Sequence, residues 1–326
     1  MCLISVIIVN WNGKQYLRDC LDAVLGQDFS TFEVILVDNG SSDGSVLFVQ
    51  NNYPSVKVVQ LMENRGFTGG NIAGFSVANG DFIALLNNDT RPEKGWLVAL
   101  HRGMVSDSRI GICSSKIVIE GTGRIDSIGE HFTTAFTGTK LGNLQSCQEF
   151  SSPMFVHGAC AAAALYRRKM LDDIGFLDND FFFNHEDTDL NLRAWLAGWK
   201  SLFLPDAIVH HKVSASIGKL SAETVYYFSR NNEWVWLKNV PLRLMVRYLP
   251  QRMFYEITSF VFYGIKSGKF FPFLKGKLDA LKRAPVMIGK RRAVRKIIRI
   301  SSQEIATELM PITLYVRERF FLDQEE

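Results

Sequence analysis

Two aspartates in this 326-residue sequence lie at or just beyond the end of a run of apolar residues, in positions where a carboxylate can bind a ligand. Asp38 follows Val34–Val37, and Asp89 follows Phe82–Leu86 and two asparagines. Each run has the length of a buried strand and is too short for a core helix. In an open α/β sheet, ligands bind where the strands end, and a carboxylate there can hold a divalent cation beside a diphosphate.

The residues after Asp38 could also serve a nucleotide. Residues 39–43 (Asn-Gly-Ser-Ser-Asp) allow backbone N–H groups to approach a ligand closely. A carboxylate only accepts hydrogen bonds, so Asp38 can pair with the imide N–H of uracil or thymine. Local structure offers alternatives, because Ser42 or Asp43 can cap a helix and residues 87–89 can form a turn.

A third polar stretch that follows a predicted strand is the glycine-rich Asn64–Asn71, which is predicted to be a loop. Taken alone, it reads as an ordinary flexible loop. Three polar stretches of this kind at the ends of strands on one sheet edge nevertheless favour a pocket for a nucleoside diphosphate.

A further acidic cluster, Glu186, Asp187 and Asp189, is predicted in the first turn of a helix. The helix dipole would favour each acid by about 0.3–1 kcal/mol, and Asp189 could form a surface ion pair with Arg193 worth a few tenths of a kcal/mol. The run Phe181–Phe183 should bury the start of this helix. Buried acids are costly unless they are used or paired, which favours a catalytic role for Asp187.

The surrounding pattern predicts the elements that position these residues. Strand-like and helix-like segments alternate up to Ile119, which indicates an α/β fold with a mostly parallel sheet and helices on both faces. The expected strands are Ile4–Val9, Phe32–Val37, Val56–Leu61, Phe82–Leu86 and Ile110–Ile119. The expected helices are Gln15–Leu25, Ser45–Asn51, Asn71–Ala78 and Lys94–Val105. Farther along we expect an irregular connection (Gly121–Gln148), a strand-loop-strand (Phe155–Tyr166), a helix (Glu186–Leu196), a strand (Ser201–Leu204) and helices after Ser221.

Several classes of protein are disfavoured. The first predicted strand is followed by Asn10-Trp11-Asn12-Gly13, which is neither a dinucleotide-binding fingerprint nor the loop of a sugar-phosphate nucleotidyltransferase, and no P-loop occurs. Five cysteines without a Cys-x-x-Cys pair indicate a reducing compartment and no zinc site. The apolar start lacks the features of a signal peptide, and no run approaches the roughly 20 apolar residues of a membrane span.

The motifs in order resemble family 2 glycosyltransferases with the GT-A fold, and among these the bacterial rhamnosyltransferase-like members. The likeness covers about two thirds of the chain. It is carried by Asn-Trp-Asn-Gly, Val-Asp-Asn-Gly-Ser-Ser-Asp, Asn-Arg-Gly-Phe-Thr-Gly-Gly-Asn, Leu-Leu-Asn-Asn-Asp-Thr, Gly158-Ala159-Cys160, Gly-Phe-Leu-Asp at 175–178, His-Glu-Asp-Thr-Asp-Leu at 185–190 and His-Lys-Val-Ser-Ala-Ser at 211–216.

The resemblance implies a role for each matching position. Asp187, with Glu186, would be catalytic; Asp89 and His211 would bind a divalent Mg²⁺ or Mn²⁺; and Gly158, Ala159 and Arg193 would face the acceptor. The donor nucleotide would be bound by Val9, Asn10, Asn12, Asp38, Gly40, Arg65, Gly66, Gly69, Asn71, Asn88, Asp89 and Lys212.

Two features of the sequence leave the strength of metal binding and the identity of the histidine ligand undecided. Asn87 replaces the first acid of the family's Asp-x-Asp motif, so tight metal binding without the donor diphosphate is in doubt. His210 is adjacent to His211, and the sequence alone does not separate them. The arrangement predicts that Asp38, Asp89, Asp187 and His211 converge on one cleft.

The implied reaction is an inverting transfer from a nucleoside-diphosphate sugar, with dTDP-rhamnose as the leading donor and a lipid-linked surface glycan as acceptor. Asp187 would take the proton of the attacking hydroxyl. A UDP-galactofuranose or UDP-hexose donor, and a non-catalytic scaffold that binds glycan or membrane, remain alternatives.

The C-terminal part differs in charge from the rest. From Leu220 onward it carries 19 Lys and Arg against 10 Asp and Glu, although the whole chain has a net charge of only +4. Aromatic residues interleave with these basic residues at helical spacing, which favours a peripheral helical region at the inner face of the cell membrane of a cytoplasmic protein. A helical subdomain with a solvated basic face is the alternative, no nucleic-acid module is recognisable, and an oligomer remains possible. We therefore expect a catalytic domain over residues 1–219, with nucleotide binding in 1–119 and acceptor binding in 120–219, and a basic helical region over 220–326.

Overall fold

The computed structural model describes residues 3–212 and 220–317 of the chain. Their contacts group the chain into two compact units, each assembled from separated segments. Unit 1 comprises residues 1–130, 140–183 and 199–216, and unit 2 comprises residues 131–139, 184–198 and 217–326. The sequence prediction placed one boundary after residue 219, whereas here two earlier segments group with the C-terminal residues.

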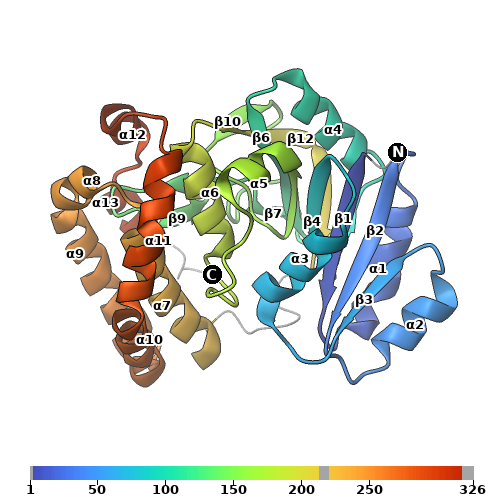
Figure 1. Ribbon diagram of the computed structural model, residues 1–326, viewed down its shortest axis with the longest axis horizontal. Helices are drawn as coiled ribbons and strands as arrows, with labels where there is room; N and C mark the ends of the chain where they lie inside the picture. The colour runs from blue at the N-terminus through green and yellow to red at the C-terminus, as the bar shows by residue number, and fades with distance from the viewer. Residues whose placement is uncertain (1–2, 213–219, 318–326) are drawn as a thin grey trace. The chain divides into compact units, whose positions relative to one another are not determined.

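Unit 1 is built on a mixed sheet, with helices α1 (Lys14–Leu25), α2 (Ser45–Asn52), α3 (Gly66–Val77), α4 (Trp96–Ser106) and α5 (Arg168–Ile174) (Figure 1). Its strands follow the order β10-β12-β6-β11-β4-β1-β2-β3, with β5 paired to β12 and β7 to β6. The strand bounds are β1 Ile4–Asn10, β2 Phe32–Asn39, β3 Lys57–Leu61, β4 Phe82–Asn87, β5 Thr90–Pro92, β6 Ile110–Ile119, β7 Arg124–Ser127, β10 Met154–Val156, β11 Ala163–Arg167 and β12 Lys200–His211.

The strand register brings the polar strand ends together. Strands β1, β2, β3 and β4 pair in parallel, with Asn10 opposite Asp38 and Val9 opposite Asn87. Strand β11 is antiparallel to both β4 and β6, and β12 is parallel to β6, so β12 runs in the same direction as β4. His211, at the end of β12, therefore lies at the same sheet edge as the ends of β1, β2 and β4.

Alternation along β1 explains why helices cover both faces of the sheet. Ile4, Val6 and Ile8 are buried in a core with residues of α1 and α4. Ile7 and Val9 point the other way, toward α3. Side chains that alternate between faces need apolar cover on both, so residues 6–9 of the strand form a continuous apolar run.

The predicted loop at Asn64–Asn71 is wrong from Gly66 onward, because α3 begins there. A Cβ atom on Gly70 would lie 2.6 Å from Val9 Cγ1, and one on Gly74 would lie 2.5 Å from Ile7 Cγ2. These two glycines allow α3 to pack closely on β1, a role that glycine serves as well as it serves ligand approach.

The other sequence-predicted segments of unit 1 agree with the structure to within one or two residues, with two exceptions. Helix α3 begins five residues before the predicted start at Asn71, and β12 is much longer than Ser201–Leu204. A break in its register between Leu204 and Ile208 lets the strand continue to His211. The stretch Gly121–Gln148, predicted to be irregular, contains β7 and the paired short strands β8 (Glu130–Phe132) and β9 (Gly138–Lys140).

Unit 2 is helical. Its helices are α6 Glu186–Leu196, α7 Ala222–Asn239, α8 Leu242–Arg247, α9 Leu249–Ser259, the π-helix η1 Phe260–Lys266, α10 Phe270–Lys282, α11 Ala284–Ile297, α12 Ser302–Glu308 and α13 Ile312–Arg317. Ala135, Val225, Tyr255, Phe273 and Ile312 share one apolar cluster. Within residues 3–212 and 220–317, no helix is long and apolar enough to cross a bilayer.

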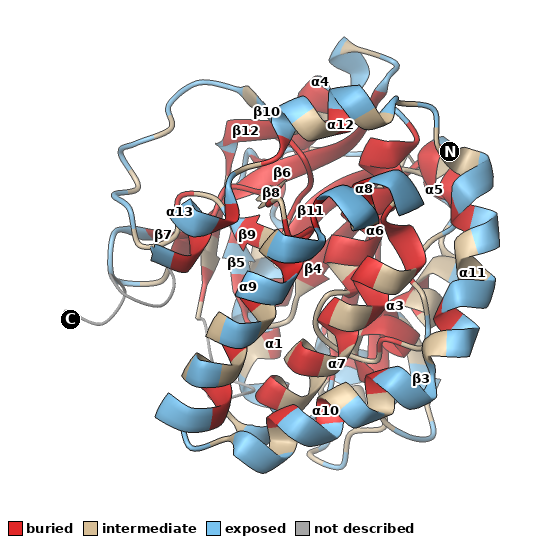
Figure 2. Ribbon diagram, turned by 90° about the vertical axis from the view of Figure 1, so that its left-hand side faces the viewer, coloured by how far each residue is buried: buried red, intermediate tan, exposed pale blue. Residues whose placement is uncertain are grey.

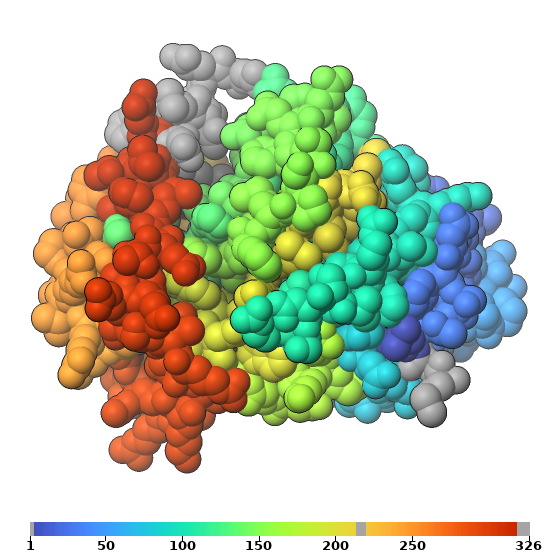
Figure 3. Space-filling model, turned by 90° about the horizontal axis from the view of Figure 1, so that it is seen from above, coloured from blue at the N-terminus to red at the C-terminus, as the bar shows by residue number. Residues whose placement is uncertain are grey.

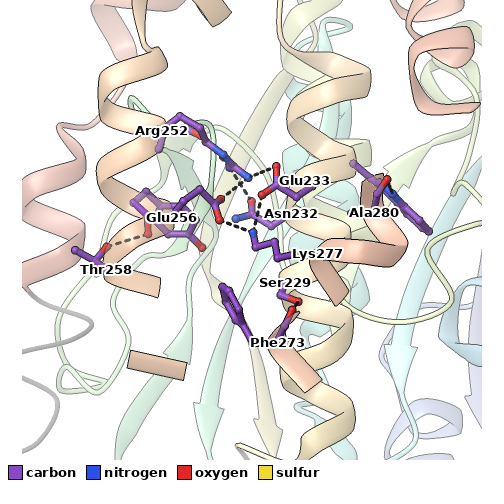
Figure 4. Close-up of polar contacts among 12 residues, drawn as sticks. Ser229, Asn232, Glu233, Arg252, Glu256, Thr258, Phe273, Lys277 and Ala280 are labelled. Carbon is purple, nitrogen blue, oxygen red and sulfur yellow. Dashed lines mark hydrogen bonds and ion pairs between the residues drawn. The ribbon is translucent and has the colours of Figure 1, made fainter. Parts of the chain in front are cut away.

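A charged cluster ties α7, α9 and α10 together inside unit 2 (Figure 4). Arg252 lies 3.1 Å from Glu233 and 2.7 Å from Glu256, and Lys277 pairs with both carboxylates. Arg252 also donates to the backbone oxygen of Ala135. Residue 135 and the C-terminal helices therefore belong to one packed body, because this buried guanidinium takes partners from each.

Candidate active site

The residues at the carboxyl ends of β1 and β2 and in the loops that follow them are joined by hydrogen bonds. Ser41 N donates to Asp38 Oδ2 at 3.1 Å, and Asn10 Nδ2 lies 3.5 Å from Asp38 Oδ1. Asn12 donates its N–H to Ser41 Oγ and accepts from Ser42 N at 2.8 Å. Asp38 is fully buried, so its carboxylate has a fixed position at the strand end and retains acceptor capacity for one further donor.

Asn88, the residue after β4, joins this group. Its Nδ2 donates to Asn10 Oδ1 at 2.8 Å, which links the exits of β1 and β4. A Cβ atom on Gly13 would collide with this pair, so the glycine of Asn-Trp-Asn-Gly leaves room for it. Gly40 adopts φ +77, the left-handed conformation that glycine favours.

Asp89 and His211 lie side by side because β5 pairs with β12. Lys212 N donates to Asp89 O at 3.0 Å, and His211 Nε2 lies 3.3 Å from Asp89 Oδ1. His210 points elsewhere and contacts Glu93 Oε1 at 3.0 Å. The strand's alternation thus distinguishes the two histidines and selects His211 as the partner of Asp89.

The other nitrogen of His211 contacts a residue that the sequence did not single out. Nδ1 lies 3.0 Å from Asp126 Oδ2, and Lys140 Nζ lies 2.7 Å from Asp126 Oδ1. Burial alone would raise the pKa of Asp126, but Lys140 and the His211 ring outweigh it and hold that pKa well below its ordinary value. Burial would lower the pKa of His211, whereas its bonds to Asp126 and Asp89 raise it to about 9.

The Asp89–His211 pair can hold a divalent ion. In an octahedral site with bonds of about 2.1 Å, neighbouring ligand atoms lie about 3 Å apart, close to the 3.3 Å observed here. Among the described residues, no three His, Cys, Asp or Glu side chains form a ready metal site. Two protein ligands suit an ion that takes its remaining ligands from a diphosphate and water.

The remaining donor-site candidates of unit 1 are distributed unevenly. Arg65 is largely exposed and lies 3.7 Å from Glu63, while Lys212 pairs with Asp19 at 2.9 Å. Gly66 and Gly69 lie in the first turns of α3, and Asn71 is buried there with its amide donating to Phe67 O. The polar end of the Asn71 side chain is thus used inside its own helix.

Two acceptor-site candidates also lie in unit 1. Gly158 exchanges backbone hydrogen bonds with Glu130, and Ala159 is fully buried. The motif that begins at His211 continues into residues 213–216, which lie outside the described part of the chain.

Helix α6 of unit 2 carries the acidic cluster and has the predicted bounds. Asp187 Oδ1 accepts from Thr188 N at 2.8 Å, and Glu186 is buried. The expected ion pair between Asp189 and Arg193 forms at 2.9 Å, but its expected place at the surface is wrong, because both side chains are buried. Asp189 also accepts from Lys238 at 2.8 Å and from Asn239 at 2.8 Å, so burial of this acid is compensated by three partners.

His185 precedes α6 in a left-handed conformation with φ 65. Its Nε2 is buried without a hydrogen-bond partner among the described residues, and its ring lies 4.9 Å from that of Phe228. Burial lowers the pKa of His185 to about 3, helped by the charges of Arg252 and Lys277. The neutral ring therefore packs beside the start of α6.

The structure brings together Asn10, Asp38, Asn88, Asp89 and His211 at one edge of unit 1. Asp187 belongs to unit 2, so its convergence with Asp89 stays a prediction. Asp126 and Lys140 were missed, since they lie in a stretch without periodicity or a recognisable motif.

Comparison with known proteins shows the family to which this chain is similar. The family model described as glycosyl transferase family 2 matches residues 5–175, just over half of the chain. Glycosyltransferase GlyA of Streptococcus pneumoniae serotype 4 is 23% identical over 219 residues, which are 64% of this chain and 30% of that protein. The chain therefore matches less than a third of the length of this relative.

Two solved structures share the fold. GalNAc-T7, solved with UDP, GalNAc and Mn²⁺, has a TM-score of 0.64 at 18% identity, over 87% of this chain and 56% of that one. Residues 1–349 of S. aureus TarS, in complex with UDP-GlcNAc, give 0.56 at 18% identity, over 94% and 92%. With its mostly parallel sheet, its helical C-terminal region and the family match, this chain belongs to glycosyl transferase family 2 and has the GT-A fold.

Proposed function

We propose that this protein transfers a sugar from a nucleoside diphosphate to a hydroxyl acceptor with inversion at the anomeric carbon. The observation that carries this proposal is the cluster of Asn10, Asp38, Asp89 and His211 at the carboxyl edge of the sheet, on the fold of a glycosyltransferase family. The name of the relative GlyA and the UDP and UDP-GlcNAc complexes of the structural neighbours support the reaction class.

The nucleobase and the diphosphate of the donor would be bound at the carboxyl ends of β1, β2 and β4 in unit 1. Asp38 would accept from the pyrimidine imide, and Asn10, Asn12, Gly40 and Asn88 would shape the pocket around it. Val9, Arg65, Gly66 and Lys212 are the further donor contacts that we propose. Gly69 and Asn71 would act indirectly, by forming the start of α3.

Asp89 and His211 would hold a Mg²⁺ or Mn²⁺ ion, as the Mn²⁺ in the GalNAc-T7 structure supports. When bound, such an ion neutralises charge on the leaving diphosphate. Asp187 would take the proton from the acceptor hydroxyl, with Glu186 beside it, and Gly158, Ala159 and Arg193 would lie on the acceptor side. Because Arg193 is bound to Asp189, it would act by holding α6 in place.

We propose dTDP-rhamnose as the donor, on the strength of the sequence resemblance. UDP-galactofuranose and UDP-hexoses are the alternatives, and the UDP-bound neighbours favour testing uridine donors equally. A panel of nucleotide sugars, assayed for thermal shift and hydrolysis with and without Mn²⁺, tests this. Stabilisation by dTDP-rhamnose above all others is expected, and preference for a uridine donor would replace it.

The acceptor that we propose is a lipid-linked glycan, and we propose that unit 2 attaches the protein to the membrane that carries this acceptor. Large apolar side chains are exposed at helical spacing along α8, α9 and η1, and more follow on α10. In Figure 2 the exposed positions of α8, α9 and α10 are pale blue. The stripe consists of Leu242, Val246, Leu249, Met253, Ile257, Val261 and Ile265, all at least 48% exposed. Scattered exposed apolar residues are normal, whereas a stripe of this length marks an interaction surface.

Charge points to lipid as the partner of this stripe. Arg243, Arg247 and Lys266 are exposed beside it, whereas the basic run from Lys290 to Lys296 lies on α11, which packs on α7. Figure 3 shows the surface that the orange and red residues, all of unit 2, form together. Basic residues around an apolar stripe match an anionic membrane, where each Lys or Arg contributes about 1 kcal/mol. Attachment at the inner face of the cell membrane would bring a cytoplasmic enzyme to a lipid-linked acceptor.

A further inference from the structure

We infer that Asp126 is a positioning residue that holds His211 in the orientation and tautomer required to bind the divalent ion. This inference rests on the metal-dependent transfer proposed above. Asp126 itself would not touch the ion or the substrate, because the imidazole ring stands between its carboxylate and Asp89.

The His211 ring is held between two carboxylates. His211 Nδ1 lies 3.0 Å from Asp126 Oδ2, while Nε2 lies 3.3 Å from Asp89 Oδ1. Asp126 is 3% exposed and comes from β7, which pairs with β6, the neighbour of β12. The carboxylate therefore rests on the same sheet as His211 and fixes the plane of the ring.

The hydrogen bond to Asp126 also decides which nitrogen of His211 carries the proton. With an ion bound, the His211 imidazole is neutral and carries one N–H, and only the other nitrogen can donate its lone pair to the metal. An ionised carboxylate only accepts hydrogen bonds, so Asp126 keeps the proton on Nδ1 and leaves Nε2 for the ion. Carboxylate–histidine–metal arrangements of this kind commonly orient the ligand in metal sites.

Lys140 completes the arrangement. Its ammonium group lies 2.7 Å from Asp126 Oδ1, and it keeps the buried carboxylate charged. It also makes Asp126→Asn informative: Lys140 would bind the amide oxygen and turn the NH₂ group toward His211 Nδ1. That nitrogen would then have to accept, and the proton would move to Nε2, where it blocks metal binding.

The test measures Mn²⁺ affinity directly, from the electron paramagnetic resonance signal of free Mn²⁺, with saturating UDP or dTDP. We expect Asp126→Asn to bind Mn²⁺ about 10–100-fold more weakly than the wild type. Asp126→Glu should restore part of the affinity. In a His211→Gln background, Asp126→Asn should cause no further loss, because the residue through which it acts is absent.

Two outcomes separate this inference from the proposed function. If Asp126→Asn binds Mn²⁺ as tightly as the wild type, the positioning role is overturned alone. If the wild type binds no Mn²⁺ with either nucleotide, the metal-dependent reaction and this role are both overturned.

A measurement on the wild type covers the case in which Asp126→Asn does not fold. In ¹⁵N NMR spectra of histidine-labelled protein with Mg²⁺ and nucleotide, the His211 signals are identified by their loss in His211→Gln. Nδ1 should be protonated and Nε2 unprotonated, and the reverse tautomer would refute the role.

Discussion

At the scale of single residues, environment determines what each ionisable group can do. Asp38, Asp126 and Asp189 are all buried carboxylates, but each has a different set of partners. Asp38 is held by Ser41 N and a nearby Asn10, Asp126 by Lys140 and His211, and Asp189 by two cations and an amide. Residue type alone could not assign these roles, since each depends on groups distant in the chain.

The first prediction concerns Asp187, the proposed general base. Asp187→Asn should abolish sugar transfer, with a loss of at least about 100-fold, because an amide cannot take the acceptor proton. Donor binding, measured by calorimetry, should be retained. The matched control is Glu223→Gln, which neutralises an exposed acid in the first turn of α7 and should leave turnover unchanged. Unchanged turnover of Asp187→Asn would remove Asp187 from the mechanism.

His185 makes a prediction about pH. Its pKa is about 3 in the folded protein, below the ordinary value of 6.5, so the unfolded chain binds its proton first as the pH falls. The stability that this group contributes is therefore present above pH 6.5 and decreases below it, by about 2 kcal/mol at pH 5.

Urea denaturation between pH 7.5 and 5 checks this prediction. His185→Asn removes the titrating ring, and asparagine tolerates the left-handed backbone at this position. The variant should lose less stability than the wild type over this pH range, whatever its stability at pH 7.5. Parallel curves for the two proteins would show that His185 does not titrate as described.

At the scale of elements, packing explains what the glycines and the exposed apolar residues do. Gly70 and Gly74 let α3 rest against Val9 and Ile7 of β1. On α8, α9 and η1, inward positions such as Tyr255 are buried, while the residues of the apolar stripe lie between them and are exposed. A helix that faces water would not gain from apolar residues on both sides, so the outer stripe indicates a second contact.

The exposed stripe makes the third prediction. The triple variant Val246→Glu, Met253→Glu and Ile257→Glu should weaken binding to vesicles of phosphatidylglycerol and phosphatidylcholine by about tenfold or more, because three apolar contacts are lost. Flotation of the full chain measures this. Met62→Glu with Leu47→Glu is the matched control, since both residues are exposed apolar residues of unit 1.

The control should float like the wild type, and 1 M salt should reduce flotation of both through screening of the basic residues. Equal flotation of the triple variant and the wild type would show that the stripe is not the membrane contact.

At the scale of the whole molecule, unit 2 is discontinuous in sequence. Its segment 184–198 contains α6, whose partners Lys238 and Asn239 lie in α7. The C-terminal region is therefore not an appendage that can be removed without consequence. It supplies the charges and amides that compensate a buried acid two residues from the proposed catalytic base.

Truncation makes the fourth prediction. A chain that ends at residue 216 should lose protection in α6, with amides exchanging at least about tenfold faster, because Asp189 would keep only Arg193 as a charged partner. Hydrogen exchange with mass spectrometry measures this, and a chain that ends at residue 317 is the control. Unchanged protection of residues 186–196 in the shorter chain would show that α6 folds without α7.

The sequence by itself determined the elements and the kind of chemistry. Apolar runs of strand length, each ending in polar residues, predicted β1, β2 and β4 and placed Asp38 near the sheet edge, because short-range patterning sets where strands begin and end. The ordered motifs also indicated the family, which the family match confirms.

The tertiary structure alone decided which side chains meet. His210 and His211 are neighbours in sequence, and only the pairing of β12 with β5 directs His211 toward Asp89. Asp126 has no local signature, and it became visible when β7 brought it to Nδ1 of that ring. Likewise, Asp189 looks like a surface acid until α7 supplies its partners. Long-range contacts of this kind depend on how elements pack, and no window of the sequence contains both partners.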